Sequence, residues 1–176
     1  MDLQILEREE LARTLERLAY SILERHGTVE NLLLVGIQRR GVDLATRLGT
    51  IIKDCTGHVI PLGTLDINLY RDDWTSLSAI PALGSSSIPL PLEDKQVILV
   101  DDVLFTGRTI RAALEAILDY GRPAKVELLV LVDRGLRELP IQADYVGRSV
   151  NTSATERVDV LLSERDGLDE VRLTRP

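Results

Sequence analysis

Apolar runs alternate with amphipathic segments along most of the chain. Short runs predict strands at residues 31–37, 58–65, 97–100, 126–132 and 143–147. Between the strands, residues 7–26, 42–53 and 110–117 carry apolar positions at helical spacing. Buried strands that alternate with helices predict an α/β fold, in which a mostly parallel twisted sheet is flanked by helices.

Two regions depart from this alternation. Residues 66–94 show little periodicity and contain several proline, glycine and serine residues. A loop of this length inside a compact domain is usually functional or mobile, so we expect a flexible lid. Near the end of the chain, residues 158–162 and 170–173 are expected to pair with each other. No internal repeat interrupts the pattern, and we expect residues 1–176 to form a single domain.

The most informative segment is residues 97–109. A buried strand, Val97 to Val100, is followed by Asp101 and Asp102, and Thr106-Gly107-Arg108-Thr109 then opens a helix. The unpaired N–H groups and the dipole of a helix N-terminus attract a phosphate. Two carboxylates beside it suit a sugar diol or a hydrated Mg²⁺. The segment therefore predicts a ribose-phosphate site; the alternative is an ordinary strand-to-helix turn with solvated acids.

Two further segments have functional interpretations. Arg39 and Arg40 follow a buried strand and could bind a second phosphate group, although a basic surface turn would have the same sequence. Tyr70, Arg71 and Trp74 open the long loop and could exclude water from a closed site; the alternative is a solvated hairpin.

A third segment, residues 132–148, contains a tyrosine at position 145. Tyr145 could stack on a planar base while the backbone near Val146 contacts the polar edge of that base. The local sequence favours the alternative, a strand in which Tyr145 is half-buried.

Composition narrows the class of protein. The net charge of −7 gives no global attraction to nucleic acid or anionic membranes. The N-terminal residues lack the pattern of a signal peptide, and no run is long enough to span a membrane. We therefore expect a cytoplasmic protein.

Residues 97–109 resemble the phosphoribosyl-pyrophosphate (PRPP) motif of type I phosphoribosyltransferases. Together with other segments, they resemble the family of bifunctional pyrimidine-operon regulators and uracil phosphoribosyltransferases over nearly the whole chain. The matching segments are residues 34–37 with Arg40 and Gly41, 66–73, 97–109 with Phe105, 132–135, 137–141 and 143–145. The resemblance implies the type I phosphoribosyltransferase fold, with a lid over residues 66–94 and a small hood and base-binding part over residues 133–162.

The resemblance also implies a reaction and its residues. Uracil and PRPP would give UMP and diphosphate, with Mg²⁺ bound through PRPP and water rather than by direct protein ligands. Phe105 stands where purine-specific relatives often place an aspartate. The implied catalytic residues are Asp101, Asp102 and Arg40, and the implied lid includes Tyr70 and Arg71. The implied base site consists of Arg134, Tyr145, Val146 and Val158. The implied PRPP site consists of Arg39, Arg40, Asp101, Asp102, Val103, Leu104, Phe105, Thr106, Gly107, Arg108 and Thr109.

The resemblance further implies a homodimer or larger homo-oligomer that binds pyrimidine-operon leader RNA under control of UMP or UTP. Arg17, Arg25 and Arg148 fit a face that contacts RNA phosphates. The chain departs from RNA-binding members at Glu16, Arg39, Leu136 and Gln142, where such members tend to carry small hydroxyl residues, a histidine and an arginine. An alternative function is a nucleotide-sensing RNA-binding regulator with little or no turnover.

Overall fold

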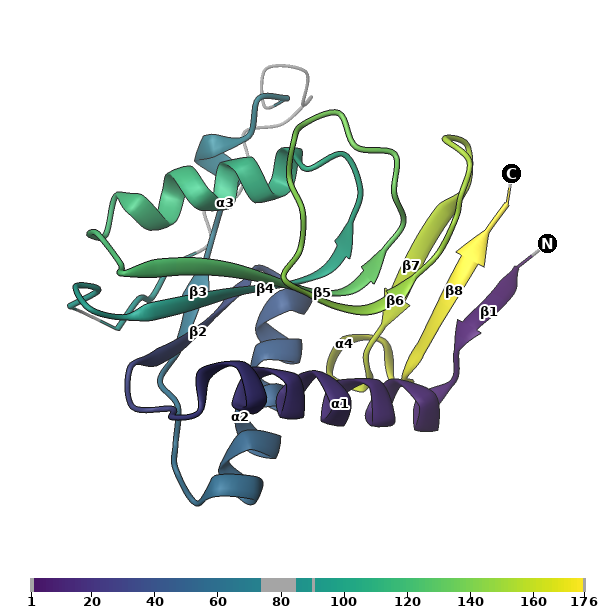
Figure 1. Cartoon of the computed structure of the whole chain (residues 1–176). Coiled ribbons are helices and arrows are strands. Elements are labelled where there is room, and N and C mark those ends of the chain that lie inside the picture. Colours follow the sequence, from purple (N-terminus) through teal and green to yellow (C-terminus); the bar gives the residue numbers. More distant parts are fainter. Residues whose placement is uncertain (1, 74–84, 90, 176) are drawn as a thin grey trace.

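A five-stranded parallel sheet forms the centre of the computed structural model, which describes residues 2–73, 85–89 and 91–175 (Figure 1). The strand order is β3-β2-β4-β5-β6. The strands are β2 (Leu32–Ile37), β3 (Leu62–Leu65), β4 (Gln96–Leu104), β5 (Lys125–Asp133) and β6 (Tyr145–Ser149). The predicted parallel α/β architecture is confirmed. Trp74 and most of the predicted lid lie outside the described residues.

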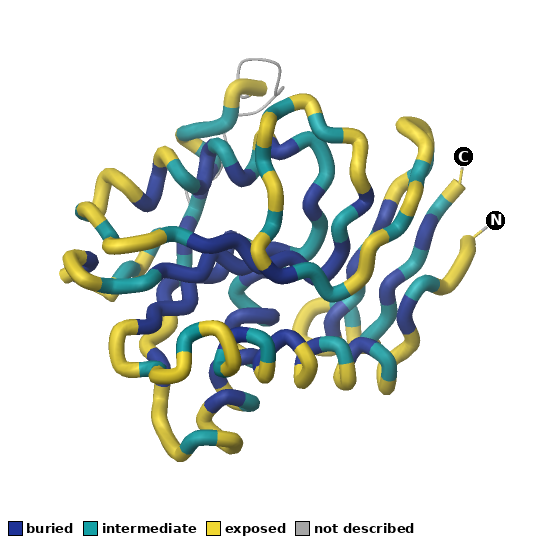
Figure 2. The backbone as a smooth tube through the Cα atoms, viewed as in Figure 1, coloured by how far each residue is buried: buried dark blue, intermediate teal, exposed yellow. Residues whose placement is uncertain are grey.

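Helices cover both faces of this sheet. α1 (Arg8–His26) and α2 (Arg40–Thr56) pack on one face, and α3 (Arg108–Leu118) packs on the other (Figure 1). The predicted stripe of α1 is buried, since Leu11, Leu15, Leu18 and Ile22 are all nearly inaccessible. Figure 2 shows the consequence, with the buried backbone concentrated in the central strands and the exposed backbone in the loops and on the outer surfaces of the helices.

A second, antiparallel sheet lies beyond the carboxyl ends of the central strands (Figure 1). Its order is β1-β8-β7, with β1 (Leu3–Leu6), β7 (Arg157–Leu161) and β8 (Glu170–Thr174), and the short α4 (Ser163–Asp166) connects β7 to β8. The predicted pairing near the end of the chain is confirmed. Of the predicted hood, residues 133–162, only β7 belongs to this second sheet. β6 belongs to the central sheet, and the hood is built from both ends of the chain because β1 pairs with β8.

The boundaries of two strands also differ from the prediction. β3 begins at Leu62 rather than at residue 58, and β4 continues through both aspartates to Leu104. Pairing with β5 extends β4, since Asp101 lies opposite Val130 and Leu104 opposite Asp133. Backbone hydrogen bonds, which side-chain polarity does not reveal, decide where a strand ends.

The order of the strands places a topological switch point between β2 and β4. From β2 the chain passes outward to β3 and then returns to form β4 on the other side of β2. In open α/β sheets, ligands bind at the carboxyl ends of strands at such a point. Within the described parts of the chain, we find no helix with the length and apolarity needed to cross a membrane.

Candidate active site

Two loops meet at the switch point. One is the basic turn Gln38-Arg39-Arg40-Gly41 after β2, and the other leads from β4 into α3. Gly41 packs directly against β4, because a Cβ atom there would lie 2.2 Å from the carbonyl oxygen of Val100 and 3.4 Å from the Cα atom of Asp101. The two segments that the sequence singled out as phosphate sites therefore lie side by side.

The turn from β4 into α3 depends on Gly107. This residue is the N-cap of α3 and has a φ of 92°, a conformation that side chains disfavour. A Cβ atom there would also lie only 3.0 Å from Ile141 Cγ1. The hydroxyl of Thr106 accepts a hydrogen bond from the Arg108 N–H at 3.3 Å. The turn thus exposes the N-terminus of an eleven-residue helix at the carboxyl end of β4, which is the geometry of an anion site.

The two adjacent aspartates lie in different environments. Asp101 is buried, with 6 % of its surface exposed, whereas Asp102 is half-buried. Burial, followed by the neighbouring charge of Asp102, raises the pKa of Asp101 well above its ordinary value. Backbone N–H groups donate to both carboxylates, from Asp102 to Asp101 at 3.0 Å and from Val103 to Asp102 at 2.8 Å. A buried carboxylate with a second carboxylate directly beside it is unfavourable for stability alone and is typical of a functional site.

The segment after β5 holds the carbonyl groups of the phosphate turn. Leu104 O accepts from the Arg134 N–H at 3.0 Å, and Thr106 O accepts from Glu138 N–H at 2.9 Å and Leu139 N–H at 3.1 Å. These bonds determine the shape of the turn before any ligand binds. The side chain of Leu104 is buried in the core, so Leu104 contributes to the turn through its backbone.

Arg137 links the same parts and was absent from the predicted site residues. Its guanidinium donates to Phe105 O at 2.9 Å, to Ile141 O at 2.8 Å and to Asp133 Oδ2 at 2.6 Å. Burial alone would raise the pKa of Asp133, but hydrogen bonds from Arg137 and Gly135 outweigh it and lower that pKa. The Asp-Arg-Gly-Leu-Arg sequence was visible in the chain, but nothing local identified which arginine binds the turn.

Arg134 does not have the free guanidinium expected of a base-binding residue. Only 6 % of its surface is exposed, and its guanidinium stacks on Phe105, with the carbon Cζ 4.0 Å from the ring centroid. It also donates to Thr152 Oγ1 at 3.0 Å and to the carbonyl oxygens of Ser153 and Glu156 at 2.9 and 2.7 Å. Arg134 therefore packs against one face of the Phe105 ring and forms hydrogen bonds with the segment that leads to β7.

The side chain of Tyr145, which was predicted to lie at the base site, packs in the core on the α1 face of the sheet. Tyr145 is the first residue of β6 and pairs with Leu129 of β5, which pairs in turn with Val100 of β4. It therefore lies near the middle of the sheet, one residue before the level of Asp101. It is 5 % exposed, and its hydroxyl donates to Glu127 Oε2 at 2.8 Å and lies 3.1 Å from His26 Nε2. This network raises the pKa of Tyr145 through burial and through the Glu127 hydrogen bond.

The other two predicted base residues are also part of the packing. Val146 follows Tyr145 in β6 and is partly buried against the α3-side core. Val146 lies level with Asp101, two strands away, because Val130 of β5 pairs with both residues. Val158 lies in β7 and is buried in the core between the hood and the central sheet, where partly buried Val103 also packs.

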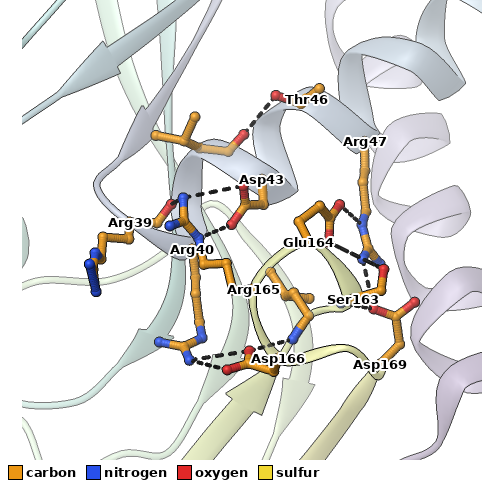
Figure 3. Close-up of polar contacts among 12 residues, drawn as sticks. Arg39, Arg40, Asp43, Thr46, Arg47, Ser163, Glu164, Arg165, Asp166 and Asp169 are labelled. Atoms are coloured by element: carbon orange, nitrogen blue, oxygen red, sulfur yellow. Dashed lines mark hydrogen bonds and ion pairs between the residues drawn. The ribbon is translucent and has the colours of Figure 1, made fainter.

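The two arginines of the basic turn have different surroundings. Arg39 is exposed, and in Figure 3 its guanidinium points away from α4. Arg40 points toward the hood and donates to both carboxylate oxygens of Asp166, at 3.0 and 3.2 Å. The structure thus brings both residues to the switch point, but it leaves only the Arg39 guanidinium directed away from the hood.

The predicted lid residues lie beside α3. Tyr70 ends the short helix η1 (Asn68–Tyr70) and donates a hydrogen bond from its hydroxyl to Asp119. Arg71 pairs with Asp73 at 2.6 Å. Arg108 forms ion pairs with Asp72 and Glu138, both at 2.6 Å, and so links the start of the long loop to the phosphate turn. Half-buried Thr109 follows in the first turn of α3.

The three arginines predicted to contact RNA lie along α1 and β6 and make contacts within the protein. Arg17 donates to Gly147 O at 2.5 Å, and Arg148 donates to Ile5 O at 3.4 Å. Arg25 stacks on Tyr145 and lies 3.4 Å from Asp144 Oδ1 and 3.5 Å from Glu127 Oε1. Two of them, Arg17 and Arg25, line a surface hollow of about 440 Å³ together with Leu18, Ser21, Glu24, Asp144, Tyr145 and Val146.

A family model and known relatives match this arrangement. The model of the phosphoribosyl transferase domain matches residues 2–163. The bifunctional protein PyrR of Desulfosudis oleivorans is 56 % identical to this chain, and the alignment covers 98 % of this chain and 96 % of the relative. The bifunctional protein PyrR of Pelotomaculum thermopropionicum is 54 % identical, and the alignment covers 96 % of this chain and 93 % of the relative. Among solved structures, the hypoxanthine phosphoribosyltransferase of Trypanosoma cruzi has the same fold, with a TM-score of 0.73 at 18 % identity, and covers 98 % of this chain and 96 % of its own.

The strand order, the phosphate turn with its two carboxylates, and the matched domain define a phosphoribosyltransferase. Within this class, the chain belongs to the family of bifunctional PyrR proteins, since identity above 50 % extends over nearly its whole length. The family resemblance of the sequence, which implied uracil phosphoribosyltransferase activity together with pyrimidine regulation, is confirmed.

Proposed function

We propose that this chain transfers the phosphoribosyl group of PRPP to uracil at the switch point between β2 and β4. The observation that carries the proposal is the packing of Gly41 against Val100, which places the basic turn beside the Asp101–Thr109 segment. One ligand can then contact both loops, with its 5′-phosphate at one and its diphosphate at the other. PRPP has phosphates at opposite ends of a ribose and fits this arrangement.

Each part of PRPP has a partner of suitable chemistry. The N-terminus of α3 and the hydroxyls of Thr106 and Thr109 bind the 5′-phosphate. The carboxylates of Asp101 and Asp102 accept hydrogen bonds from the two ribose hydroxyls. Arg39 binds the diphosphate, since its guanidinium is exposed at the turn beside Asp101. These contacts orient the anomeric carbon between the leaving diphosphate and the base.

The carboxylates also suit the magnesium ion that accompanies PRPP. Among the described residues, no group of three or more acidic, histidine or cysteine side chains forms a protein metal cage. Two adjacent carboxylates fit Mg²⁺ instead, because this ion usually takes few protein ligands and completes its shell with phosphate oxygens and water. When bound, Mg²⁺ neutralises charge on the diphosphate; Asp101 and Asp102 are the residues that would hold it, through water.

The reaction exchanges one bond at the anomeric carbon. The bond to the diphosphate oxygen breaks, a bond to uracil N1 forms, and the N1 proton is released. The carbon passes through a cation-like state, so preorganised charge and the exclusion of water are the main contributions of the protein. A strong general base is unnecessary because uracil is acidic at its ring nitrogens. This agrees with the apolar Phe105, which Arg134 supports at 4.0 Å.

A steady-state assay of the full chain with PRPP, Mg²⁺ and uracil tests this function. UMP and diphosphate should form in equal amounts, whereas hypoxanthine in place of uracil should give little product. The absence of UMP formation at saturating PRPP and uracil would leave the regulatory role as the function of the chain. Faster turnover of hypoxanthine than of uracil would contradict the assignment of the base.

We expect Thr106→Val to weaken PRPP binding by about 1.5–3 kcal/mol, the scale of a hydrogen bond to a charged phosphate. Thr106→Ser keeps the hydroxyl, including its bond with the Arg108 N–H, and should retain most of the affinity. Titration calorimetry with PRPP and Mg²⁺ measures both variants. Equal losses in the valine and serine variants would show that the hydroxyl does not bind the phosphate.

We further propose that the chain acts as a homo-oligomer in the cytoplasm and regulates pyrimidine genes through nucleotide-dependent RNA binding. Arg17, Arg25 and Arg148 are the residues for this contact, and they share the α1 and β6 surface. Acidic groups offset the positive charge of this surface. Asp144 and Glu127 lie close to Arg25, and Glu24 lines the same hollow. RNA phosphates must compete with these carboxylates.

RNA binding is therefore expected to be weak compared with typical family members. The loss of two or three phosphate contacts should lower the affinity and flatten the salt dependence by about 0.7–0.9 in log–log slope for each contact. A filter-binding titration with the pyrimidine-operon leader RNA of the source organism, over a salt series with and without UMP, measures both quantities. Glu16→Gln removes one negative charge from α1 and should tighten binding at low salt. Nanomolar, UMP-enhanced binding at physiological salt would contradict this prediction.

A further inference from the structure

The short helix α4 of the hood is bound to α2 by two groups of ion pairs (Figure 3). The first lies at the basic turn, where Arg40 pairs with Asp166 and Arg165 pairs with Asp43. The second lies two turns further along α2, where Arg47 pairs with Glu164 at 2.5 Å and with Asp169 at 2.7 Å. Both groups join α2 to α4 or to the residues that follow α4, but only the first reaches the turn.

The first group holds the backbone of the basic turn as well as its side chains. Arg165 donates from Nη2 to the carbonyl oxygen of Arg39 at 3.3 Å and to Asp43 Oδ1 at 3.4 Å. Asp43 lies in the first turn of α2, directly after Gly41 and Val42. Arg165 therefore connects the backbone of Arg39, the residue before α2, to the first turn of this helix.

The Arg40–Asp166 pair is a partly buried contact. The Arg40 side chain is 33 % exposed and that of Asp166 is 22 % exposed. Asp166 also accepts a hydrogen bond from the Leu162 N–H at 2.9 Å, which keeps its carboxylate oriented toward Arg40. The Leu162 N–H and the charge of Arg40 lower the pKa of Asp166, so this carboxylate is charged at neutral pH. The hood thus holds the Nη2 group of Arg40, while Nε is buried without a hydrogen-bond partner among the described residues.

We propose that Asp166 and Arg165 are positioning residues for the diphosphate-binding turn, and that Arg40 acts through Asp166 rather than as a ligand of the diphosphate. In this arrangement, Arg39 alone of the two arginines binds the leaving group. The hood then contributes to PRPP binding without touching PRPP. This inference rests on the proposed function for the identity of the ligand.

The alternative role of Arg40 predicts the opposite result for one variant. If Arg40 binds the diphosphate directly, Asp166 competes with the substrate, and Asp166→Asn should release Arg40 and lower the KM for PRPP. If Asp166 positions the turn, the same variant loosens the turn and raises that KM. The direction of the change therefore decides between the two roles.

We expect Asp166→Asn to raise the KM for PRPP and the inhibition constant of diphosphate roughly tenfold, the scale of one lost charge-assisted hydrogen bond. The KM for uracil should change less than about twofold, because the phosphate turn and the segment after β5 are untouched. Asp166→Glu restores the charge and should recover part of the lost affinity. Arg165→Gln should have the same pattern as Asp166→Asn.

Glu164→Gln is the matched control, because it weakens the second group of ion pairs on the same helix and leaves the turn intact. It should leave the KM for PRPP unchanged. Equal effects of Glu164→Gln and Asp166→Asn on the KM for PRPP would show that α4 only stabilises the fold, and this would overturn the proposal. A lower KM for PRPP in Asp166→Asn would also overturn it.

Calorimetric titration of the full chain with magnesium diphosphate separates this inference from the proposed function, since it requires no turnover. If the wild type lacks transferase activity but still binds diphosphate, weaker binding in Asp166→Asn supports the positioning role while the proposed reaction fails. Unchanged or tighter binding in Asp166→Asn overturns the positioning role even in an active enzyme.

Discussion

Replacing Asp101 and Asp102 together with asparagine should lower turnover of PRPP and uracil by roughly 10²–10⁴-fold, the effect of two charge-assisted hydrogen bonds at about 1.5–3 kcal/mol each. The chain should remain folded, because the change alters few atoms and keeps oxygen acceptors for the N–H groups of Asp102 and Val103. Steady-state kinetics and circular dichroism measure the two effects. Near-wild-type turnover in the double variant would contradict the ribose assignment.

The single variant Asp101→Asn should be more stable than the wild type at neutral pH, by roughly 0.5–2 kcal/mol. Burial and Asp102 raise the pKa of Asp101 in the folded state above its ordinary value of 3.8. The protonated form therefore contributes stability that is present in acid and is lost as the pH rises through the raised pKa.

Denaturant unfolding at several pH values checks the sign of this effect. The stability gain of Asp101→Asn should be largest at neutral pH and should shrink below the ordinary aspartate pKa, where the wild-type carboxyl is uncharged in both states. Asp102→Asn is the comparison variant, since Asp102 is only half-buried. If Asp101→Asn is less stable than the wild type at neutral pH, the charge of Asp101 does not destabilise the folded state.

Replacing Gly41 with alanine should have the second large effect, on both stability and activity. The new Cβ atom would lie 2.2 Å from the carbonyl oxygen of Val100, and a backbone atom in a central strand cannot rotate aside. The start of α2 must move away from β4, which we expect to cost about 1–3 kcal/mol of stability. The basic turn moves with it, so kcat/KM should fall by about 10²-fold.

Gly49→Ala on the same helix is the control for Gly41→Ala. Its Cβ atom would meet only the Leu62 side chain, at 3.2 Å, and this side chain is 40 % exposed and can move. Because alanine favours a helix over glycine, this variant should be as stable as the wild type or more so, with unchanged kcat/KM. Wild-type kcat/KM in Gly41→Ala would show that contact between the two loops is unnecessary for catalysis.

Most of the fold was predictable because its signals are local. β2 is a continuous apolar run, β5 contains the apolar run Leu128–Val132, and α1 carries its buried stripe at helical spacing. The phosphate turn was equally clear, since Asp101, Gly107 and the start of α3 lie within a few residues of each other. The lid prediction stays a prediction, because residues 74–84 and 90 lie outside the described part of the chain.

The roles of individual site residues were harder to predict. Tyr145 has the residue type of a base-stacking group, but its position at the amino end of β6 directs its hydroxyl to Glu127, 18 residues earlier in the chain. Arg134 and Arg137 are three residues apart and chemically alike, yet one supports Phe105 and the other binds the carbonyl of Phe105. Residue type alone could not separate these roles.

The sequence by itself determined the parallel α/β core, the phosphate turn with its pair of carboxylates, and the family. Each of these rests on residues that are close together in the chain, so local periodicity and turn chemistry reveal them. Only the tertiary structure decided that the hood joins both ends of the chain and that Arg40 pairs with Asp166, 126 residues away. Such pairs form because the fold brings distant charges together and excludes part of the water between them, which no local pattern records.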